Sequence, residues 1–438
     1  MKPTLRAIAL TGLIFSSASA QNVNRDATWR PAALYEVFVR DFSPAGNFRG
    51  VTAGLDRIQA TGADVVWLMP IYPIGKVNRK GTLGSPYSVA DYRGINPDFG
   101  NAADLRQLVS AVHARKMKII LDFVPNHTAF DHSWITQHPD RYTHDKSGRI
   151  SVAIDNDGKL TDWTDVADLN YDNPETRRAI IDDMRYWIDN FKIDGFRVDV
   201  AGFIPDSFWS QAVPELRRGK RLYLLAEWDA PKLHALGYDL TYDWNDYHAL
   251  IDVWKGKSAA GFAPAALKDA QGLPNHGMRM RFTTNHDETA WNSPAITLWN
   301  GSRGARAAFV ATAMLPGVPL LYNGQEVESP QRLPLFEKDP VNWKQPDADN
   351  ARKFYRRVIE ISQRFASAPA TVVSNSASDD VISYRRGDAL VLVNTRPRAV
   401  TVSVDGMRPA GMRDLLTGKR QAGSKIALPG YAALVLSH

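Results

Sequence analysis

Residues 118–127, Lys-Ile-Ile-Leu-Asp-Phe-Val-Pro-Asn-His, form a short apolar run that ends in polar residues. Such a run is typical of a strand buried in a parallel sheet. Similar runs recur along the chain between longer segments of helical period, which is the pattern of β–α units. We count eight candidate strands, and eight is the number that closes a (β/α)8 TIM barrel of the α/β class. They are Tyr35–Val39, Asp64–Met69, Lys118–Val124, Ile193–Val200, Arg221–Ala226, Tyr238–Thr241, Met280–Thr284 and Pro319–Tyr322.

The segments between these strands have the apolar spacing of amphipathic helices. We expect their apolar stripes to pack on the outside of the barrel. One stripe consists of Leu105, Leu108, Val109 and Val112, and another of Ile180, Met184, Trp187, Ile188 and Phe191.

Two segments interrupt the alternation of strands and helices. Residues 129–173 are rich in Asp, His, Thr and Gly and are too long for an ordinary connection, so they predict a short inserted subdomain after the third strand. Residues 368–438 alternate short strands with turns and predict a C-terminal antiparallel β-sandwich domain. The barrel would then comprise residues 21–128 and 174–367.

Composition indicates a globular protein and excludes several kinds of site. Hydrophobic residues make up 44% of the 438 residues and charged residues 23%. Because the chain has no cysteine, disulfides, thiolate nucleophiles, iron–sulfur clusters and cysteine-bound zinc are all excluded. The net charge of +6 is not concentrated: the densest basic stretch, residues 217–221, is typical of a solvated helix end. No nucleic-acid partner is therefore expected.

The first 20 residues predict a secretory signal peptide. Lys2 and Arg6 precede an apolar run over residues 7–15, and the small residues Ala18-Ser19-Ala20 follow. The apolar run is shorter than the roughly 20 residues that span a bilayer, so we expect cleavage near Ala20 and no membrane anchor. Since the chain lacks cysteine, we expect a secreted or periplasmic bacterial protein.

Acidic residues stand where the candidate strands end. Asp199 belongs to the fourth strand, Glu227 follows the fifth, and Asp287 follows the seventh. The carboxyl ends of barrel strands form one rim, and that rim carries the active site in such folds. Arg197 lies two residues before Asp199 and therefore on the same strand face. A single strand-end Asp is usually a cap or a turn residue, but three acids on one rim predict a catalytic cluster.

Four stretches resemble, in order and spacing, the four characteristic sequence regions of the α-amylase family of glycoside hydrolases. They are residues 122–127 (Asp-Phe-Val-Pro-Asn-His), 195–199 (Gly-Phe-Arg-Val-Asp), 225–227 (Leu-Ala-Glu) and 284–287 (Thr-Asn-His-Asp). Further agreements are residues 85–92 (Ser-Pro-Tyr-Ser-Val-Ala-Asp-Tyr), 168–170 (Asp-Leu-Asn) and 317–326. The resemblance covers nearly the whole chain after residue 20.

The resemblance implies catalytic roles for three residues. Asp199 is expected to be the nucleophile and Glu227 the acid/base of a retaining mechanism, which uses two carboxyl groups about 5–5.5 Å apart. Asp287 is expected to bind hydroxyls of the distorted sugar. The opposite charge of Arg197 would keep Asp199 ionised, whereas Glu227 needs a raised pKa in order to deliver its proton.

Other positions match the family's contacts to the sugar. Tyr87 is expected to stack on the sugar ring, and His127 and His286 to donate hydrogen bonds to its hydroxyls. Asp122 lies inside a strand, so we expect it to support Arg197 rather than to touch substrate. The sequence does not separate sugar platforms from packing residues for three tryptophans: Trp163, Trp228 and Trp291.

One departure from the family pattern follows the nucleophile. Many α-amylases carry a Lys-His pair there, which contributes to substrate subsites and, through a backbone oxygen, to a calcium site, but this chain has Gly202 and Phe203. Asn126 and Asp168 match positions near the family's calcium site, yet an ion that takes six to eight oxygens needs more ligands. We expect no cofactor for the chemistry, assign no metal ligand and leave a structural calcium open.

The sequence thus predicts an exported retaining hydrolase of α-1,4-glucosidic bonds in starch, glycogen or maltooligosaccharides, endo-acting and monomeric. An exo-acting α-glucosidase or maltogenic amylase, and an α-glucan transglycosylase, are alternatives within the family. A non-catalytic sugar-binding barrel is disfavoured because all three acids are present. A phosphate-binding barrel would need a glycine-rich loop near the last strands, where Glu326 stands instead.

Overall fold

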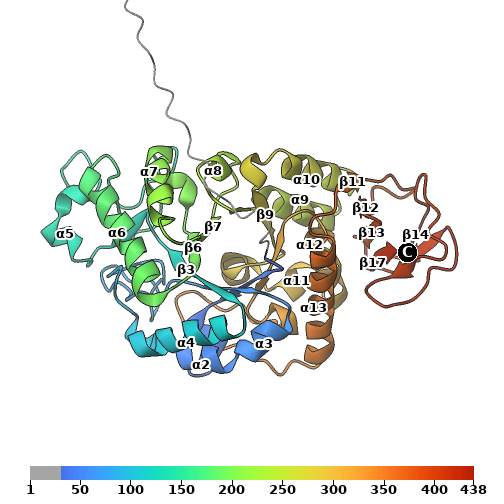
Figure 1. The fold of residues 1–438 in the computed structure, drawn as a ribbon, viewed down its shortest axis with the longest axis horizontal. Coiled ribbons are helices and arrows are strands. Elements are labelled where there is room, and N and C mark those ends of the chain that lie inside the picture. Colours follow the sequence, from blue (N-terminus) through green and yellow to red (C-terminus); the bar gives the residue numbers. More distant parts are fainter. Residues whose placement is uncertain (1–30) are drawn as a thin grey trace, which may run out of the picture.

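A computed structural model describes residues 31–438 and shows a closed barrel of eight parallel strands (Figure 1). Around the barrel the strand order is β1-β2-β3-β6-β7-β8-β9-β10. The strands are β1 (Leu34–Val37), β2 (Val65–Leu68), β3 (Lys118–Phe123), β6 (Gly195–Val198), β7 (Tyr223–Ala226), β8 (Leu240–Tyr242), β9 (Met278–Arg281) and β10 (Val318–Tyr322). The barrel is therefore confirmed, and each strand overlaps its predicted position. The predicted signal peptide, residues 1–20, lies outside the described residues.

The seventh strand is the one whose boundaries differ most from the prediction. β9 spans Met278–Arg281 rather than residues 280–284. The prediction is shifted because alternating Met and Arg residues do not have the apolar pattern of a buried strand. Arg281 is nevertheless fully buried, where it pairs with Asp243 and, at 2.5 Å, with Asp246. Paired charges thus allow a strand that the hydrophobic pattern alone does not reveal.

Helices surround the barrel and turn their apolar faces toward it. The longer ones are α4 (Ala102–Ala114), α6 (Pro174–Phe191), α7 (Asp206–Leu216), α9 (Trp244–Trp254), α10 (Phe262–Gln271), α12 (Ser302–Ala313) and α13 (Ala348–Arg364). The shorter ones are α1 (Val39–Phe42), α2 (Phe48–Ala53), α3 (Leu55–Ala60), α5 (Trp134–Gln137), α8 (Lys232–Ala235) and α11 (Ala295–Leu298). Both predicted apolar stripes, on α4 and α6, are buried.

Local sequence explains where these two helices begin. Asn101 and Asp104 form a capping box at the start of α4, each side chain accepting a hydrogen bond from the other's backbone N–H. The side chain of Asn173 accepts from the N–H of Glu175 at the start of α6, where Pro174 occupies the first helical position.

The segment between β3 and α6 projects from the barrel. It opens with β4 (His127–Ala129), which pairs antiparallel with β5 (Val166–Asp168). The residues between these two strands carry α5 and lie at the opposite end of the molecule from the C-terminal domain (Figure 1). We call residues 129–173 subdomain B.

The C-terminal domain consists of two antiparallel sheets, which confirms the expected β-sandwich. One sheet has the strand order β11-β12-β13-β17-β15 and the other pairs β14 with β16. Their bounds are β11 (Ala370–Val372), β12 (Val381–Arg386), β13 (Ala389–Asn394), β14 (Val400–Val402), β15 (Arg413–Asp414), β16 (Ile426–Leu428) and β17 (Ala433–Ser437). An apolar core that includes Leu390, Val402 and Leu428 joins the sheets.

This domain docks beside α12 and α13 (Figure 1). Arg386, on β12, is 1% exposed and donates to the backbone oxygens of Leu315 at 2.6 Å and Met314 at 3.1 Å, just past the end of α12. Tyr384 donates to the oxygen of Ala311 at 2.9 Å. Polar side chains of the sandwich therefore satisfy carbonyls at the carboxyl end of a barrel helix.

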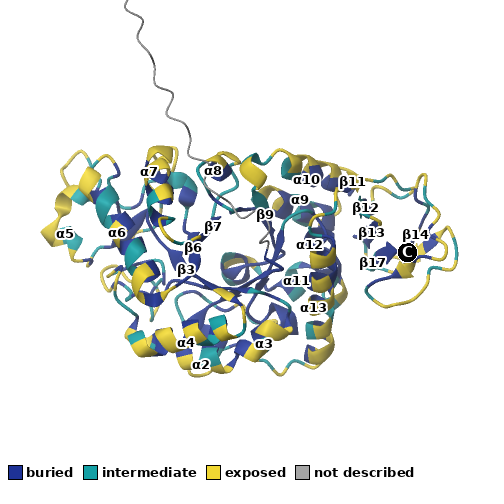
Figure 2. Ribbon diagram, viewed as in Figure 1, coloured by how far each residue is buried: buried dark blue, intermediate teal, exposed yellow. Residues whose placement is uncertain are grey.

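Burial follows the layers of the fold (Figure 2). The barrel strands are buried almost throughout, and the outer faces of the surrounding helices are exposed. Within residues 31–438, no helix combines the length and apolar character needed to cross a membrane.

Candidate active site

The structure brings the predicted site residues to one pocket at the carboxyl ends of the strands. Asp199 directly follows β6, Glu227 follows β7, and Asp287 lies beyond β9. The pocket has a volume of about 180 Å³. Six predicted residues line it: Tyr87, His127, Asp199, Glu227, His286 and Asp287. The seventh, Arg197, is fully buried in β6.

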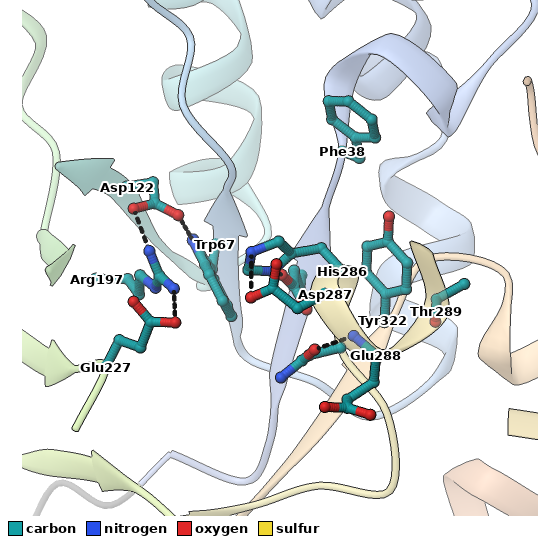
Figure 3. A network of polar contacts seen from close by, with 12 residues as sticks. Phe38, Trp67, Asp122, Arg197, Glu227, His286, Asp287, Glu288, Thr289 and Tyr322 are labelled. Carbon is teal, nitrogen blue, oxygen red and sulfur yellow. Dashed lines mark hydrogen bonds and ion pairs between the residues drawn. The ribbon is translucent and has the colours of Figure 1, made fainter. Parts of the chain in front are cut away.

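Arg197 holds three carboxyl groups together, and Figure 3 shows its contacts with two of them, Asp122 and Glu227. Its Nη1 donates to Asp199 Oδ1 at 2.7 Å and to Asp122 Oδ1 at 2.9 Å, and its Nη2 lies 2.9 Å from Glu227 Oε1. The predicted pairing of Arg197 with Asp122 is thus confirmed, and the indole N–H of Trp67 donates to the other Asp122 oxygen at 3.2 Å. Burial lowers the pKa of Arg197, but the surrounding acidic groups outweigh burial and hold this pKa well above its usual value.

Glu227 has the protonation behaviour that a general acid requires. Burial raises its pKa to about 8, and the negative charges of Asp199 and Asp287 add to this effect, whereas Arg197 opposes it. The carboxyl group is therefore protonated at neutral pH. Its Oε2 accepts a hydrogen bond of 2.8 Å from the backbone N–H of Val200.

Val200 adopts a strained backbone conformation directly after Asp199. Its φ of 36° and ψ of 47° lie in the left-handed region, which a β-branched residue rarely occupies. Such a conformation costs on the order of 1–3 kcal/mol and persists where the surroundings hold it. Here the turn directs the Val200 N–H toward the carboxyl group of Glu227.

A second charged cluster surrounds His286 (Figure 3). Its Nδ1 lies 2.5 Å from Glu36 Oε1, and its Nε2 lies 3.2 Å from Asp287 Oδ2. Burial opposes the charged imidazole, but the carboxylates of Asp287 and Glu36 hold the pKa of His286 well above its usual value. His286 in turn lowers the pKa of Asp287 against the effect of burial, so Asp287 is a carboxylate facing the pocket. A charged His286 donates from both nitrogens.

Sequence reasoning missed Glu36. It lies in β1, within the run Leu34-Tyr-Glu-Val37, and is fully buried. An acid in an otherwise apolar strand was the available signal, because such a group needs a buried partner. That partner, His286, is 250 residues further along the chain.

Tyr87 and His127 both line the pocket. The Tyr87 ring stacks on His286 with ring centres 5.4 Å apart, and its hydroxyl lies 2.7 Å from His286 Nε2. Burial lowers the pKa of His127, whose Nδ1 accepts from Asn126 Nδ2 at 3.3 Å. His127 therefore offers one N–H donor, and its ring meets Trp163 with centres 5.6 Å apart.

The residues that depart from the family pattern lie among aromatic rings. A side chain at Gly202 would place its Cβ 2.3 Å from the ring of Trp228, so the two cannot coexist in this arrangement. Phe203 stacks on Trp163 with centres 6.1 Å apart and meets the edge of Trp228 at 5.4 Å. These three partly exposed rings form an aromatic surface beside β6 and β7.

The residues near the family's calcium position form hydrogen bonds within the protein. Asp168 Oδ1 accepts from the N–H of Ile154 at 3.0 Å, and burial raises the pKa of Asp168 to about 6. Asn126 directs its amide nitrogen to His127. In the part of the chain that the structure describes, no cluster of three His, Asp or Glu side chains is placed to hold a metal.

Fold and site together define a class of protein. A closed β/α barrel carries, on its catalytic rim, one carboxyl group with a raised pKa, two further carboxylates and a stacked tyrosine beside a sugar-sized pocket. That combination is the architecture of a glycoside hydrolase with a paired-carboxyl site.

Comparison with known proteins identifies the family. The family model described as alpha amylase, catalytic domain, matches residues 15–163 and 159–251. A crystal structure of an alpha-amylase from Lactobacillus plantarum is 31% identical and superposes with a TM-score of 0.79 over 93% of this chain and 98% of that one. A noncanonic maltogenic alpha-amylase, AmyB from Thermotoga neapolitana, is 28% identical, with a TM-score of 0.82 over 92% and 98%. The chain belongs to the α-amylase family.

Curated relatives are similar over a large part of this chain. Alpha-amylase MalA of Haloarcula japonica is 28% identical over 89% of this chain and 58% of its own length. A probable oligo-1,6-glucosidase of Bacillus subtilis is 26% identical over 68% and 65%. The chain therefore spans about three-fifths of the length of these two proteins.

Proposed function

We propose that this protein is an exported retaining glycosidase that hydrolyses α-1,4-glucosidic bonds in maltooligosaccharides and related α-glucans. The observation that carries the proposal is the Arg197 guanidinium, which holds Asp199 and Glu227 side by side. Two carboxyl groups on neighbouring nitrogens favour the short separation of retaining enzymes, about 5–5.5 Å, over the 6.5–9.5 Å of inverting ones.

The mechanism assigns a distinct step to each carboxyl group. Asp199 attacks the anomeric carbon while the Glu227 proton passes to the glycosidic oxygen, so that the bond to the leaving sugar breaks and a glycosyl ester with Asp199 forms. The Glu227 carboxylate then takes a proton from water, whose oxygen attacks the same carbon and releases Asp199. Asp287, held ionised by His286, accepts hydrogen bonds from the sugar hydroxyls, which strengthen as the ring flattens.

The names of similar proteins support a glucan substrate. They include alpha-amylases, a maltogenic alpha-amylase and oligo-1,6-glucosidases. Tyr87 and the aromatic surface of Trp163, Phe203 and Trp228 offer flat apolar faces to sugar rings.

The test is a time course of maltoheptaose hydrolysis in which NMR follows the anomeric configuration of the products. We expect the α-anomer to appear first, with an unchanged rate when a calcium chelator is present. Early β-anomer would contradict the retaining mechanism, and no cleavage would contradict the proposal as a whole.

Export belongs to the proposal because residues 1–20 have the pattern of a signal peptide. Sequencing of the mature protein from a bacterial host should give Gln21 as the first residue. Light scattering of that product should give the mass of a monomer.

A further inference from the structure

The loop after β2, residues 75–87, is joined to subdomain B above the pocket. We call it the β2 loop. Asn78 Nδ2 donates to the backbone oxygen of Thr164 at 3.0 Å, and Lys80 Nζ lies 3.2 Å from Asp165 Oδ1. Asp165 is buried, so this ion pair lies at the pocket lining rather than on an open surface.

The other flank of the β2 loop is joined to the loop after β10, residues 328–347, which we call the β10 loop. The N–H of Thr82 donates to Glu337 Oε1 at 2.8 Å, and the Thr82 hydroxyl bonds to the other oxygen of the same carboxylate. The N–H of Leu83 donates to the backbone oxygen of Phe336 at 3.0 Å.

The buried guanidinium of Arg40 donates hydrogen bonds to both loops. Arg40 is 4% exposed, and its Nη1 donates to the backbone oxygens of Leu335 at 2.6 Å and Gly84 at 3.3 Å. At Gly81, where φ is +63°, an added Cβ would lie 2.6 Å from that of Phe336. The two loops are therefore in direct contact, with no room for a sugar chain between them.

Together, residues 163–166, the β2 loop and the β10 loop form a continuous wall around one side of the pocket, which we call the wall. Its side chains line the pocket: Lys80, Ser85, Trp163, Asp165, Leu335 and Phe336. Trp291, after β9, extends the wall because its ring packs against Phe336 with centres 5.3 Å apart.

The side of the pocket beside β6, β7 and β8 adjoins the wall where Trp163 stacks on Phe203, and its connections are short. Only short connections follow β6, β7 and β8, which end at residues 198, 226 and 242 and lead to helical turns at 201, 232 and 244. By contrast, β2 ends at residue 68 and the next helical turn begins at 97. The rim is therefore closed beside β10, β1, β2 and β3 and open beside β6, β7 and β8.

The position of the acid fixes how a substrate lies between the two sides. Glu227 and Trp228 follow β7, on the open side. Because the acid protonates the leaving group, the leaving sugar extends toward the open side, over Trp228 and Phe203. The sugar that Asp199 captures then faces the wall.

We propose that the wall restricts this enzyme to the non-reducing ends of α-glucan chains, from which it removes short sugars. In an α-1,4-glucan the captured sugar lies on the non-reducing side of the broken bond, so a chain that continued past it would meet the wall. The inference rests on the proposed glycosidase activity, and it differs from the endo-acting enzyme expected from the sequence.

The test compares two maltoheptaoses that carry a fluorescent label at the reducing end, one with a free non-reducing end and one blocked there by a 4,6-ethylidene group. For the wild-type chain we expect stepwise shortening of the free substrate by one fixed unit. The blocked substrate should be cleaved at least about 100-fold more slowly. Equal cleavage of both, with mixed product lengths, would overturn the wall proposal and leave the glycosidase intact. If neither is cleaved, the proposed function itself fails.

A variant tests the wall directly. Lys80→Ala combined with Glu337→Ala removes a tie on each flank of the β2 loop, and the ratio of blocked to free cleavage should rise at least about tenfold. The matched control is Arg356→Ala with Glu360→Ala, which removes an exposed ion pair on α13. The control should keep the wild-type ratio; an equal rise in both variants would overturn the proposal.

Discussion

Arg197 in the barrel and Arg386 in the β-sandwich are both buried guanidinium groups, and they have opposite surroundings. Arg197 meets the carboxyl groups of Asp122, Asp199 and Glu227, whereas Arg386 meets backbone carbonyls at the ends of α12 and α13. One side chain holds an excess of negative charge in a low-dielectric site, and the other completes hydrogen bonds that the helix ends leave unmade.

Because of this difference, the surroundings of Arg197 serve catalysis and those of Arg386 serve the stability of the fold. Burial and the acidic groups crowded around Arg197 oppose folding but raise the pKa of Glu227. The backbone carbonyls around Arg386 accept hydrogen bonds from a charged donor, and because they are uncharged they do not repel one another as carboxylates would. Changes at the first site should therefore alter activity more than stability, and changes at the second should do the reverse.

The largest expected effect is that of Asp199→Asn, which keeps the shape of the side chain but removes the nucleophilic charge. We expect kcat to fall about 10⁴-fold or more. The melting temperature should change little, because Arg197 keeps Asp122 and Glu227 as partners and the amide oxygen of the new side chain can still accept its hydrogen bond. Steady-state kinetics and thermal unfolding measure the two quantities. Near-normal turnover would show that another group is the nucleophile.

Arg197→Lys should reduce kcat/KM about 100-fold, because an ammonium group cannot hold two carboxyl groups on neighbouring nitrogens. The total charge of the cluster is kept, so the loss would report alignment alone. The matched substitution Arg386→Lys, outside the site, should leave kcat/KM unchanged. Equal effects of the two substitutions would remove the distinction between the two regions.

Arg386→Met should lower the free energy of unfolding by about 2 kcal/mol, because it leaves buried carbonyls without their donor. Urea denaturation gives this value, and kcat per folded molecule should stay at the wild-type level. The control is Arg385→Met, at the neighbouring, partly exposed position on the same strand. A drop in kcat for folded Arg386→Met would mean that the sandwich contributes to catalysis.

The last prediction needs no substitution in the site and concerns the pH dependence of the wild-type enzyme. Glu227 must be protonated to act, and its pKa is raised to about 8, so kcat/KM should be constant below that value and fall about tenfold per unit above it. A pH profile from 4 to 10 measures the alkaline limb, and Arg386→Met should show the same limb. A limb near pH 5 would indicate that the site does not raise the pKa of Glu227.

Features that depend on neighbouring residues were predictable from the sequence. All eight barrel strands overlap their predicted positions, and seven of them do so because each is a local apolar run between turn and helix signals. Asp199, Glu227 and Asp287 could be placed on one rim because strand ends of a barrel converge. The exception, β9, carries buried arginines whose partners lie on other elements.

Features that depend on distant partners were not predictable. The role of Glu36 depends on its contact with His286. The role of Thr82 depends on its hydrogen bond with Glu337, which is 255 residues further along the chain. No local pattern marks Lys80 or Phe336 as pocket residues, because loops acquire their positions only when the barrel closes. The wall is therefore a property of the folded structure alone.

The left-handed turn at Val200 has a consequence for anyone who engineers this enzyme. Selection for heat resistance alone would favour replacing Val200 with a residue that tolerates positive φ, such as Asn or Gly. A glycine would also give the backbone more freedom and loosen the N–H that bonds to Glu227. Directed evolution should therefore find that substitutions at this position, immediately beside the nucleophile, raise thermal stability at the cost of turnover.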